Sequence, residues 1–186
     1  SALGDHGAVR MAMARFQRLA LEQERGLLAE EEHGWIEPEE EELAQLDDLI
    51  SREPPLEVMT LQHLLLKGCA LESIPVLLGS ALTSLDLGRN KLMDGSIEQL
   101  NKLHNLRILR MPWNKLCAIP PEIAKLPSLH VLDLSYNMIT QIPPEISKLK
   151  NLSLLALRYN EIEVLPATLF ALTALQQLQL SHNRIA

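Results

Sequence analysis

The side chains with the greatest capacity for chemistry recur at nearly equal intervals, each directly before an asparagine. The asparagines concerned are separated by 24, 23, 23 and 23 residues. The preceding residues are Arg89, Trp113, Tyr136, Tyr159 and His182, and Arg110 and Arg158 flank them. Aromatic and arginine side chains dominate protein interfaces, because they bury a large area with little flexibility and satisfy polar groups. Their chemistry is that of partner binding, and we expect Trp113 to contribute most.

The sequence contains no motif that indicates catalysis or metal binding. A glycine-rich phosphate loop with its lysine, GxSxG, HExxH and paired CxxC are all absent. The six histidines are dispersed without metal-ligand spacing, and no Ser/His/Asp or Cys/His grouping is visible along the chain. We therefore expect no enzymatic activity, no cofactor, no metal and no small-molecule substrate.

The asparagines belong to a longer repeat. Six copies of the pattern LxxLxLxxN(or C)xL start at Leu61, Leu82, Leu106, Leu129, Leu152 and Leu175. The first copy carries Cys69 in the asparagine place, 21 residues before Asn90. Leucine makes up about a fifth of the chain while aromatic residues are only 3%, a bias typical of repeats rather than of ordinary packing.

Each copy has the features of one coil of a solenoid. In the fourth copy, alternation places Leu132 and Leu134 on one side of a short strand. The other side carries Val131, Asp133 and Ser135. Stacking such strands at a spacing of about 4.8 Å joins them into a parallel sheet and the leucines into a continuous core. The asparagine lies where the backbone turns, and its amide can satisfy backbone groups that the turn leaves unpaired. The prolines that follow favour an extended return path.

Three parts of the sequence differ from the regular repeat. Cys69 is expected to be a buried structural thiol rather than a reactive one. The copy from Leu82 has one extra residue and no proline in its return segment, so we expect a bulge there and Ser96 as the cap of a short helix. Pro112 lacks an N–H, and we expect the strand to fray there and let the indole of Trp113 project.

The pattern LxxLxLxxN(or C)xL, followed by IPPEIxxL, resembles the leucine-rich repeat family. The 23-residue period, with IPPEI at 119–123 and 142–146, is most similar to the intracellular class typified by Ras-suppressor, scribble, erbin and plant Ras-group repeat proteins. The resemblance implies an α/β fold, a curved solenoid with a short parallel β-sheet on its concave face and irregular or short helical segments on its convex side. It also implies scaffolding or regulation of signalling proteins.

We predict two parts, an N-terminal helical cap at 1–55 and a leucine-rich repeat domain of about six repeats at 56–186, the last one incomplete. The patterns at 8–33 and from Pro38 predict two helices, the second acidic. A cap would cover leucines that the first coil exposes. The alternative is an acidic docking arm for another protein, and residues 8–23 also resemble an organellar transit peptide.

The chain ends after the sixth asparagine turn, at Ala186, and a solenoid that ends there leaves apolar surface open. We expect either a longer parent protein or self-association through this end.

Charge and cysteine content indicate the cellular setting. Of the 24 acidic residues, 12 lie between Glu22 and Asp48, and from Leu56 onward there are 12 basic and 10 acidic residues. Cys69 and Cys117 are too few for a disulfide framework, and no leader and no apolar run of about 18 residues is present. We therefore expect a soluble intracellular protein without membrane contact, cytoplasmic or nuclear.

The leading functional hypothesis is a non-enzymatic protein–protein interaction module, whose concave surface binds a protein partner in intracellular signalling or scaffolding. The residues before the asparagines would form a file of stacked rings on this surface. The structural alternative is that the file only stabilises neighbouring coils.

Two further function classes stay open. Similar repeats precede enzyme domains, so the chain could be the targeting or regulatory region of a larger enzyme that continues beyond Ala186. Basic residues interleaved with rings could also bind a nucleic-acid single strand by stacking, although an excess of two bases is small for a phosphate-binding surface.

Overall fold

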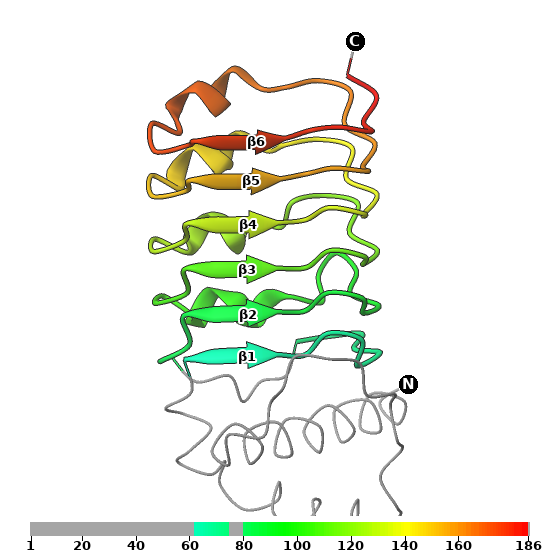
Figure 1. Ribbon diagram of the computed structural model, residues 1–186, viewed down its shortest axis with the longest axis vertical. Coiled ribbons are helices and arrows are strands. Elements are labelled where there is room, and N and C mark those ends of the chain that lie inside the picture. Colours follow the sequence, from blue (N-terminus) through cyan, green and yellow to red (C-terminus); the bar gives the residue numbers. More distant parts are fainter. Residues whose placement is uncertain (1–61, 75–79, 186) are drawn as a thin grey trace, which may run out of the picture.

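The computed structural model describes residues 62–74 and 80–185, so the predicted N-terminal cap lies outside the described residues. Six short strands form one parallel sheet in chain order (Figure 1). They are β1 (His63–Leu65), β2 (Ser84–Asp86), β3 (Ile108–Arg110), β4 (Val131–Asp133), β5 (Leu154–Ala156) and β6 (Gln177–Gln179). The described residues thus form the predicted solenoid of one strand per repeat.

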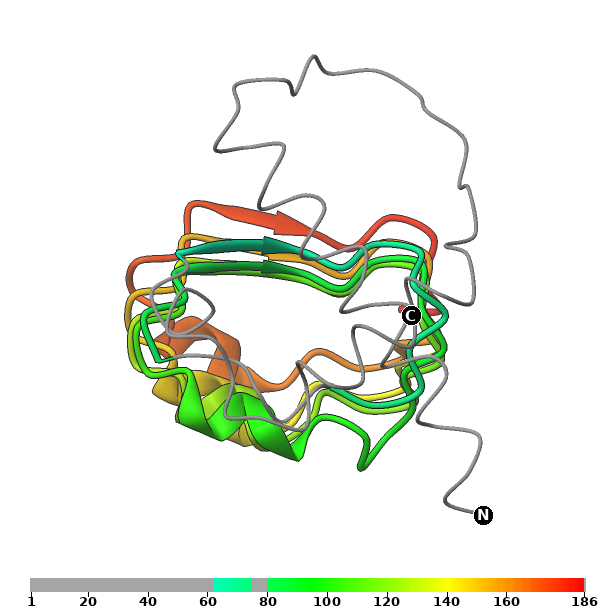
Figure 2. The same cartoon turned by 90° about the horizontal axis from the view of Figure 1, so that it is seen from below.

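The side of the solenoid opposite the sheet carries short 3-10 helices (Figure 2). These helices are η1 (Glu98–Lys102), η2 (Ile123–Lys125), η3 (Pro144–Lys148) and η4 (Ala167–Ala171). Pro144 occupies the first turn of η3, where its missing N–H needs no helical partner. The prediction of an irregular or short helical return is confirmed.

The core is a stack of equivalent leucines and isoleucines between the sheet and the 3-10 helices. Leu85, Leu109, Leu132 and Leu155 are in register across neighbouring strands and are fully buried. Full burial of such a side chain stabilises the fold by about 1.5–3 kcal/mol. Because each leucine contacts the equivalent leucine of the next coil, the core is continuous along the solenoid.

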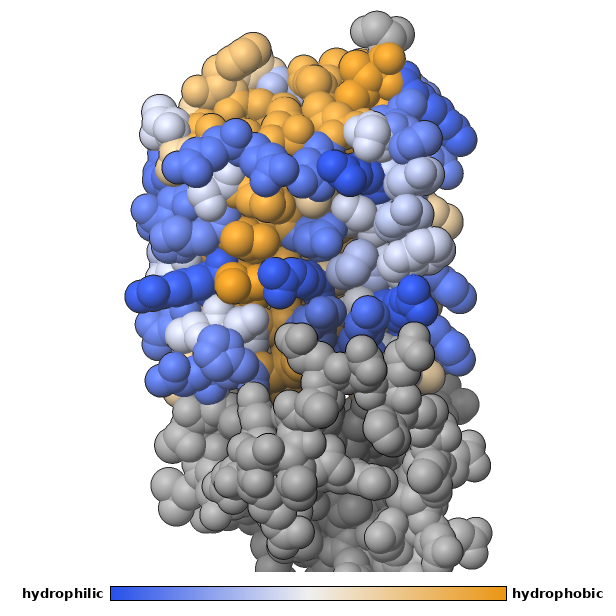
Figure 3. Space-filling view, viewed as in Figure 1, coloured by the Kyte–Doolittle hydropathy of each residue, from blue (hydrophilic) through white to orange (hydrophobic). Residues whose placement is uncertain are grey.

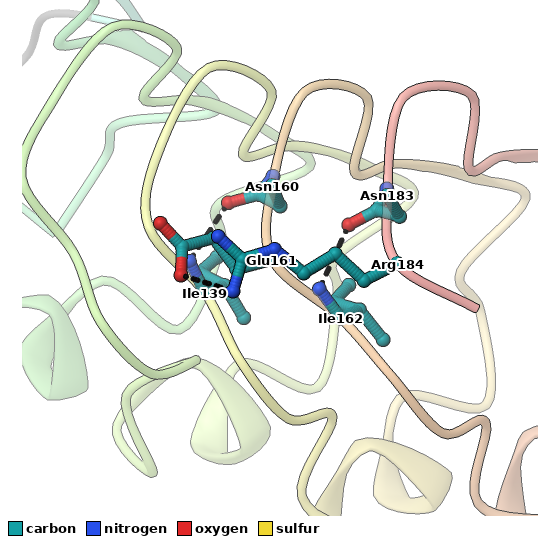
Figure 4. A network of polar contacts seen from close by, with 6 residues as sticks. All are labelled: Ile139, Asn160, Glu161, Ile162, Asn183 and Arg184. Carbon is teal, nitrogen blue, oxygen red and sulfur yellow. Dashed lines mark hydrogen bonds and ion pairs between the residues drawn. The ribbon is translucent and has the colours of Figure 1, made fainter. Parts of the chain in front are cut away.

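Buried asparagine amides join each coil to the preceding one. Asn137 is only 8% exposed, and its Oδ1 accepts a 3.1 Å hydrogen bond from the N–H of Leu116 in the preceding coil. Its Nδ2 donates to the carbonyls of Met111 and Leu134, both at 3.0 Å. The equivalent asparagines, Asn90, Asn114, Asn160 and Asn183, make the same kind of bonds. Figure 4 shows two of these amides, those of Asn160 and Asn183.

Cys69 replaces the asparagine in the first coil. It is buried, and its Sγ lies 3.8 Å from the carbonyl oxygen of Lys67. The N–H of Cys69 donates to Oδ1 of Asn90 at 3.0 Å, so the next coil secures this turn. The prediction of a buried structural thiol is confirmed.

The return segment of the second coil differs in part from the sequence prediction. A short helix, η1, does form there, but its N-cap residue is Ile97, and no side chain forms a capping hydrogen bond. Ser96 instead closes a turn, because its Oγ accepts from the N–H of Met93 at 3.1 Å and donates to the Met93 carbonyl at 2.6 Å. Gly95, with a φ of 82°, provides the left-handed residue for this longer turn.

The prediction that the strand frays at Pro112 is wrong. Strand β3 has three residues, as β2 and β4 do. Backbone pairing continues past the proline on both sides, from Arg89 N–H to the Pro112 carbonyl at 2.8 Å and from Trp113 N–H to the Ser135 carbonyl at 3.1 Å.

Pro112 does not disturb the sheet because the sheet does not use the N–H of the residue two positions before the asparagine. In the second coil the N–H of Gly88 donates to Oδ1 of Asp86 at 2.8 Å, and in the fourth the N–H of Ser135 donates to Oδ1 of Asp133 at 3.0 Å. A proline at this place therefore removes a donor that the sheet does not need.

We expect Asn137→Ala to lower the free energy of unfolding by about 3 kcal/mol or more, because a buried N–H and two carbonyls lose a partner. Urea denaturation followed by circular dichroism measures this loss. Asn151→Ala is the matched control, since this exposed amide makes one bond, to the Pro127 carbonyl, and should contribute less than about 1 kcal/mol. Equal losses in the two variants would contradict the role assigned to the buried amides.

Candidate functional site

Four rings from successive coils stack into one column, which we call the ring file: Trp113, Tyr136, Tyr159 and His182. Ring centroids are 4.0 Å apart for Trp113 and Tyr136, 4.3 Å for the two tyrosines and 4.0 Å for Tyr159 and His182, with interplanar angles of 8 to 11°. The Cζ atom of Arg89 lies 6.0 Å from the Trp113 ring centroid at one end. The predicted stacking is confirmed.

The ring file arises from a left-handed backbone at each asparagine turn. Arg89, Trp113, Tyr136, Tyr159 and His182 all have φ between 54 and 59°. This conformation costs about 1–2 kcal/mol for a residue other than glycine. The asparagine that follows fixes the turn, and each stacked ring pair stabilises the fold by about 0.5–1.5 kcal/mol. The strain is therefore offset by stacking, and the last four coils each project one ring at the same place.

An apolar stripe crosses the sheet on the same side of the molecule. We define it as Ile108, Val131 and Leu154, which are in register on β3, β4 and β5 and are half-buried. Figure 3 shows apolar atoms up the middle of this face, flanked by hydrophilic ones. The site residues predicted from the sequence are charged or aromatic and do not include this stripe. The sequence does contain a signal for it, because an apolar residue directly precedes the second leucine of LxxLxL in these three copies, and strand alternation turns this position outward.

A hollow of about 470 Å³ lies beside the ring file. All four rings line it, together with the side chains of Asp133, Ser135, Arg158 and Ser181 among others. Of the predicted site residues, Trp113, Tyr136, Arg158, Tyr159 and His182 are thus brought to one place, whereas Arg89 and Arg110 are not among the lining residues.

A family comparison explains this architecture. The profile described as a leucine-rich repeat region matches residues 56–185. The chain belongs to the leucine-rich repeat family. Proteins with such repeats generally act in protein–protein interaction. Comparison with curated proteins gave no match.

Solved structures with similar leucine-rich repeats come from distant organisms. A leucine-rich repeat protein of Leptospira interrogans is 34% identical with a TM-score of 0.65, over 69% of this chain and 33% of that chain. The repeat ectodomain of the Arabidopsis thaliana receptor kinase GASSHO1/SCHENGEN3, in complex with CASPARIAN STRIP INTEGRITY FACTOR 2, is 35% identical with a TM-score of 0.54, over 60% and 14%. The plant peptide hormone receptor RGFR1, in complex with RGF2, is 31% identical with a TM-score of 0.51, over 60% and 19%. The chain therefore spans a third or less of each of these proteins.

The acidic side chains on this face of the leucine-rich repeat domain are already engaged. Oδ1 of Asp86 and of Asp133 accept backbone N–H groups, as described for the strand ends. Glu161 pairs with Arg184 at 3.3 Å (Figure 4). Arg110 lies in register between Asp86 and Asp133.

The described residues of the leucine-rich repeat domain contain no group of three His, Cys, Asp or Glu side chains that could hold a metal ion. Within the same residues, no helix has the length and apolarity needed to cross a membrane.

Large apolar side chains are exposed at the β6 end of the described repeats, and we call them the end patch: Val164, Leu165, Phe170, Leu178 and Ile185. Phe170 is 90% exposed on η4, and Leu178 is 39% exposed, whereas the equivalent Leu155 is fully buried. Figure 3 shows apolar side chains gathered at this upper end.

Tyr136 has the perturbed ionisation of a ring enclosed on both faces. Loss of hydration raises the pKa of its phenol above the ordinary value of about 10, and the neighbouring Tyr159 raises it further, while the positive charge of Arg158 opposes the shift. The folded state therefore favours the neutral phenol. Its contribution to stability is complete below the unfolded-state pKa and is lost as the pH rises through the higher folded-state pKa.

We expect Tyr136 to ionise only above about pH 10 in the folded protein. Absorbance at 295 nm during alkaline titration measures this, and Tyr136→Phe isolates the signal because Tyr159 is the only other tyrosine. The melting temperature of the wild type should fall more steeply above pH 10 than that of Tyr136→Phe. Ionisation of Tyr136 below pH 10 would refute the enclosed geometry.

Proposed function

We propose that the strand face of this leucine-rich repeat domain is a non-enzymatic surface that binds a protein partner, with the ring file and the apolar stripe as its contact area. The observation that carries the proposal is the exposure of large rings beside a hollow. Trp113 is 51% exposed and Tyr159 is 41% exposed, although both are held rigidly by stacking. Rings of this kind bury much area at little entropic cost when a partner binds.

Similar proteins support the proposal. GASSHO1/SCHENGEN3 and RGFR1 were each solved in complex with another factor, CASPARIAN STRIP INTEGRITY FACTOR 2 and RGF2 respectively. The period and the IPPEI segments favour the intracellular class of repeat, so we further propose a role in signalling or scaffolding inside the cell. The thiols agree with a reducing compartment, since Cys117 is exposed and the chain's two cysteines form no disulfide.

A nucleic-acid function is less well supported by the geometry. Bases bind to open ring faces, but the faces within the ring file are occupied by one another at 4.0–4.3 Å. The outer face of Trp113 is approached by Arg89.

The second candidate function is that of a repeat domain that targets or regulates a larger enzyme, because one similar protein is a receptor kinase.

We expect Trp113→Ala to reduce capture of the native partner from lysate by tenfold or more, as an interface hot spot does. Its melting temperature should fall by only about 2–4 °C, because one stacked pair and one cation–π contact are lost. Quantitative mass spectrometry of captured proteins and calorimetry measure the two effects.

Phe170→Ala is the matched control, since it removes an exposed ring from η4 on the other side of the solenoid. Normal capture by Trp113→Ala with a large loss of melting temperature would leave the ring file as a stabiliser of coils only.

We also propose that the end patch mediates self-association, because its contiguous apolar side chains lie at one end of the solenoid. Phe170→Glu should convert a concentration-dependent dimer into a monomer in light scattering, because burying the new charge opposes contact. Trp113→Ala is the control and should leave the dimer intact. A wild-type protein that stays monomeric at high concentration would refute this proposal.

A further inference from the structure

We propose that the partner presents a short acidic segment, and that one carboxylate of this segment pairs with Arg158 in the hollow beside the ring file. The inference rests on the proposed function of the strand face, and it adds the chemistry of the bound partner.

The ring file offers positive edges rather than negative faces. An aromatic ring carries negative charge on its faces and positive charge at its edge. Because the rings lie face to face within 11° of parallel, their mutual faces are closed to a partner. A partner reaches ring edges, which attract oxygen acceptors and anions.

Arg158 adds a full positive charge at the same hollow. It is exposed, and among residues 62–74 and 80–185 no carboxylate forms an ion pair with it. The coils on either side place serines at the equivalent position, Ser135 and Ser181, and both line the hollow. Ser135 is buried, but the exposed Ser181 hydroxyl can donate to a carboxylate oxygen, and the guanidinium can bind a carboxylate in a bidentate manner.

No nearby acid of the described residues forms an ion pair with Arg158, although Asp133 keeps its own negative charge. Asp133, which also lines the hollow, accepts the N–H of Ser135 with its Oδ1, and Glu161 is paired with Arg184. The donors of the Arg158 guanidinium therefore stay available for a partner, and a carboxylate can accept from them whereas a basic side chain cannot.

The size of the hollow favours a short segment over a globular surface. A volume of about 470 Å³ holds a few side chains. The apolar stripe on β3, β4 and β5 gives a neighbouring apolar side chain of the same segment a place to pack. The expected ligand is thus a peptide in which acidic and apolar residues are close together.

Selection of a random peptide library on phage against the full chain tests the inference. We expect the selected peptides to be enriched in Asp and Glu over the starting library. Arg158→Gln should weaken a selected peptide about tenfold, as expected when a charge-assisted pair is lost. Lys148→Gln is the matched control, because it removes one exposed positive charge from η3, away from the hollow, and should leave the affinity unchanged.

The outcomes separate this inference from the proposed function. The acidic partner is overturned if the selected peptides have no excess of acid, or if Arg158→Gln binds acidic peptides as well as the wild type does. In either case, loss of peptide binding in Trp113→Ala would still support the strand face as the binding surface. Peptides that bind Trp113→Ala and Arg158→Gln normally overturn both. If a labelled oligothymidine binds as tightly as the peptides do, the inference is overturned and the hollow is assigned to nucleic acid. If no peptide is selected, the inference of an acidic peptide partner is also overturned.

Discussion

The hydrogen bonding of the buried asparagine amides is the interaction on which the rest of the structure depends. A backbone that turns sharply after a three-residue strand leaves N–H and C=O groups without partners in an apolar interior. The amide supplies a donor and an acceptor at once, and it forms hydrogen bonds within its own coil and to the preceding one. Asn137, for example, bonds Leu134 in its own coil and Leu116 and Met111 in the preceding coil. Coils are thereby locked in register, and the leucines of each coil meet the equivalent leucines of the next.

The proposed binding surface is a by-product of that same turn. To bring the amide inward, the preceding residue adopts a left-handed conformation, with φ of 59° at Trp113 and 56° at Tyr136. Its side chain must then project outward beside the sheet. Because the turn recurs in every coil, a ring at this place meets the side chain at the same place in the neighbouring coil. One structural requirement in the core thus fixes the position of exposed rings, and only their identity is left for function to select.

The sequence predicted well what is set by periodicity. The recurrence of leucine and asparagine was sufficient for the strands, the buried amides, the thiol of Cys69 and the stacked ring file. It failed where one side chain chooses between two local partners, as Ser96 does in bonding Met93 instead of a helix end. It also failed at Pro112, because the aspartates that absorb the equivalent N–H groups lie two residues earlier, in Asp86 and Asp133. The apolar stripe was missed although alternation places Val131 on the outward side of its strand, because charge and aromaticity alone were taken as signs of a binding residue.

The spacing of the ring file has a mechanical consequence for the solenoid. Ring centroids are 4.0–4.3 Å apart, whereas parallel strands lie about 4.7–4.9 Å apart. Attraction between the rings therefore draws neighbouring coils closer together at the ring file than the usual strand spacing would place them. Any ligand that inserts between two rings would therefore have to separate the coils that carry them.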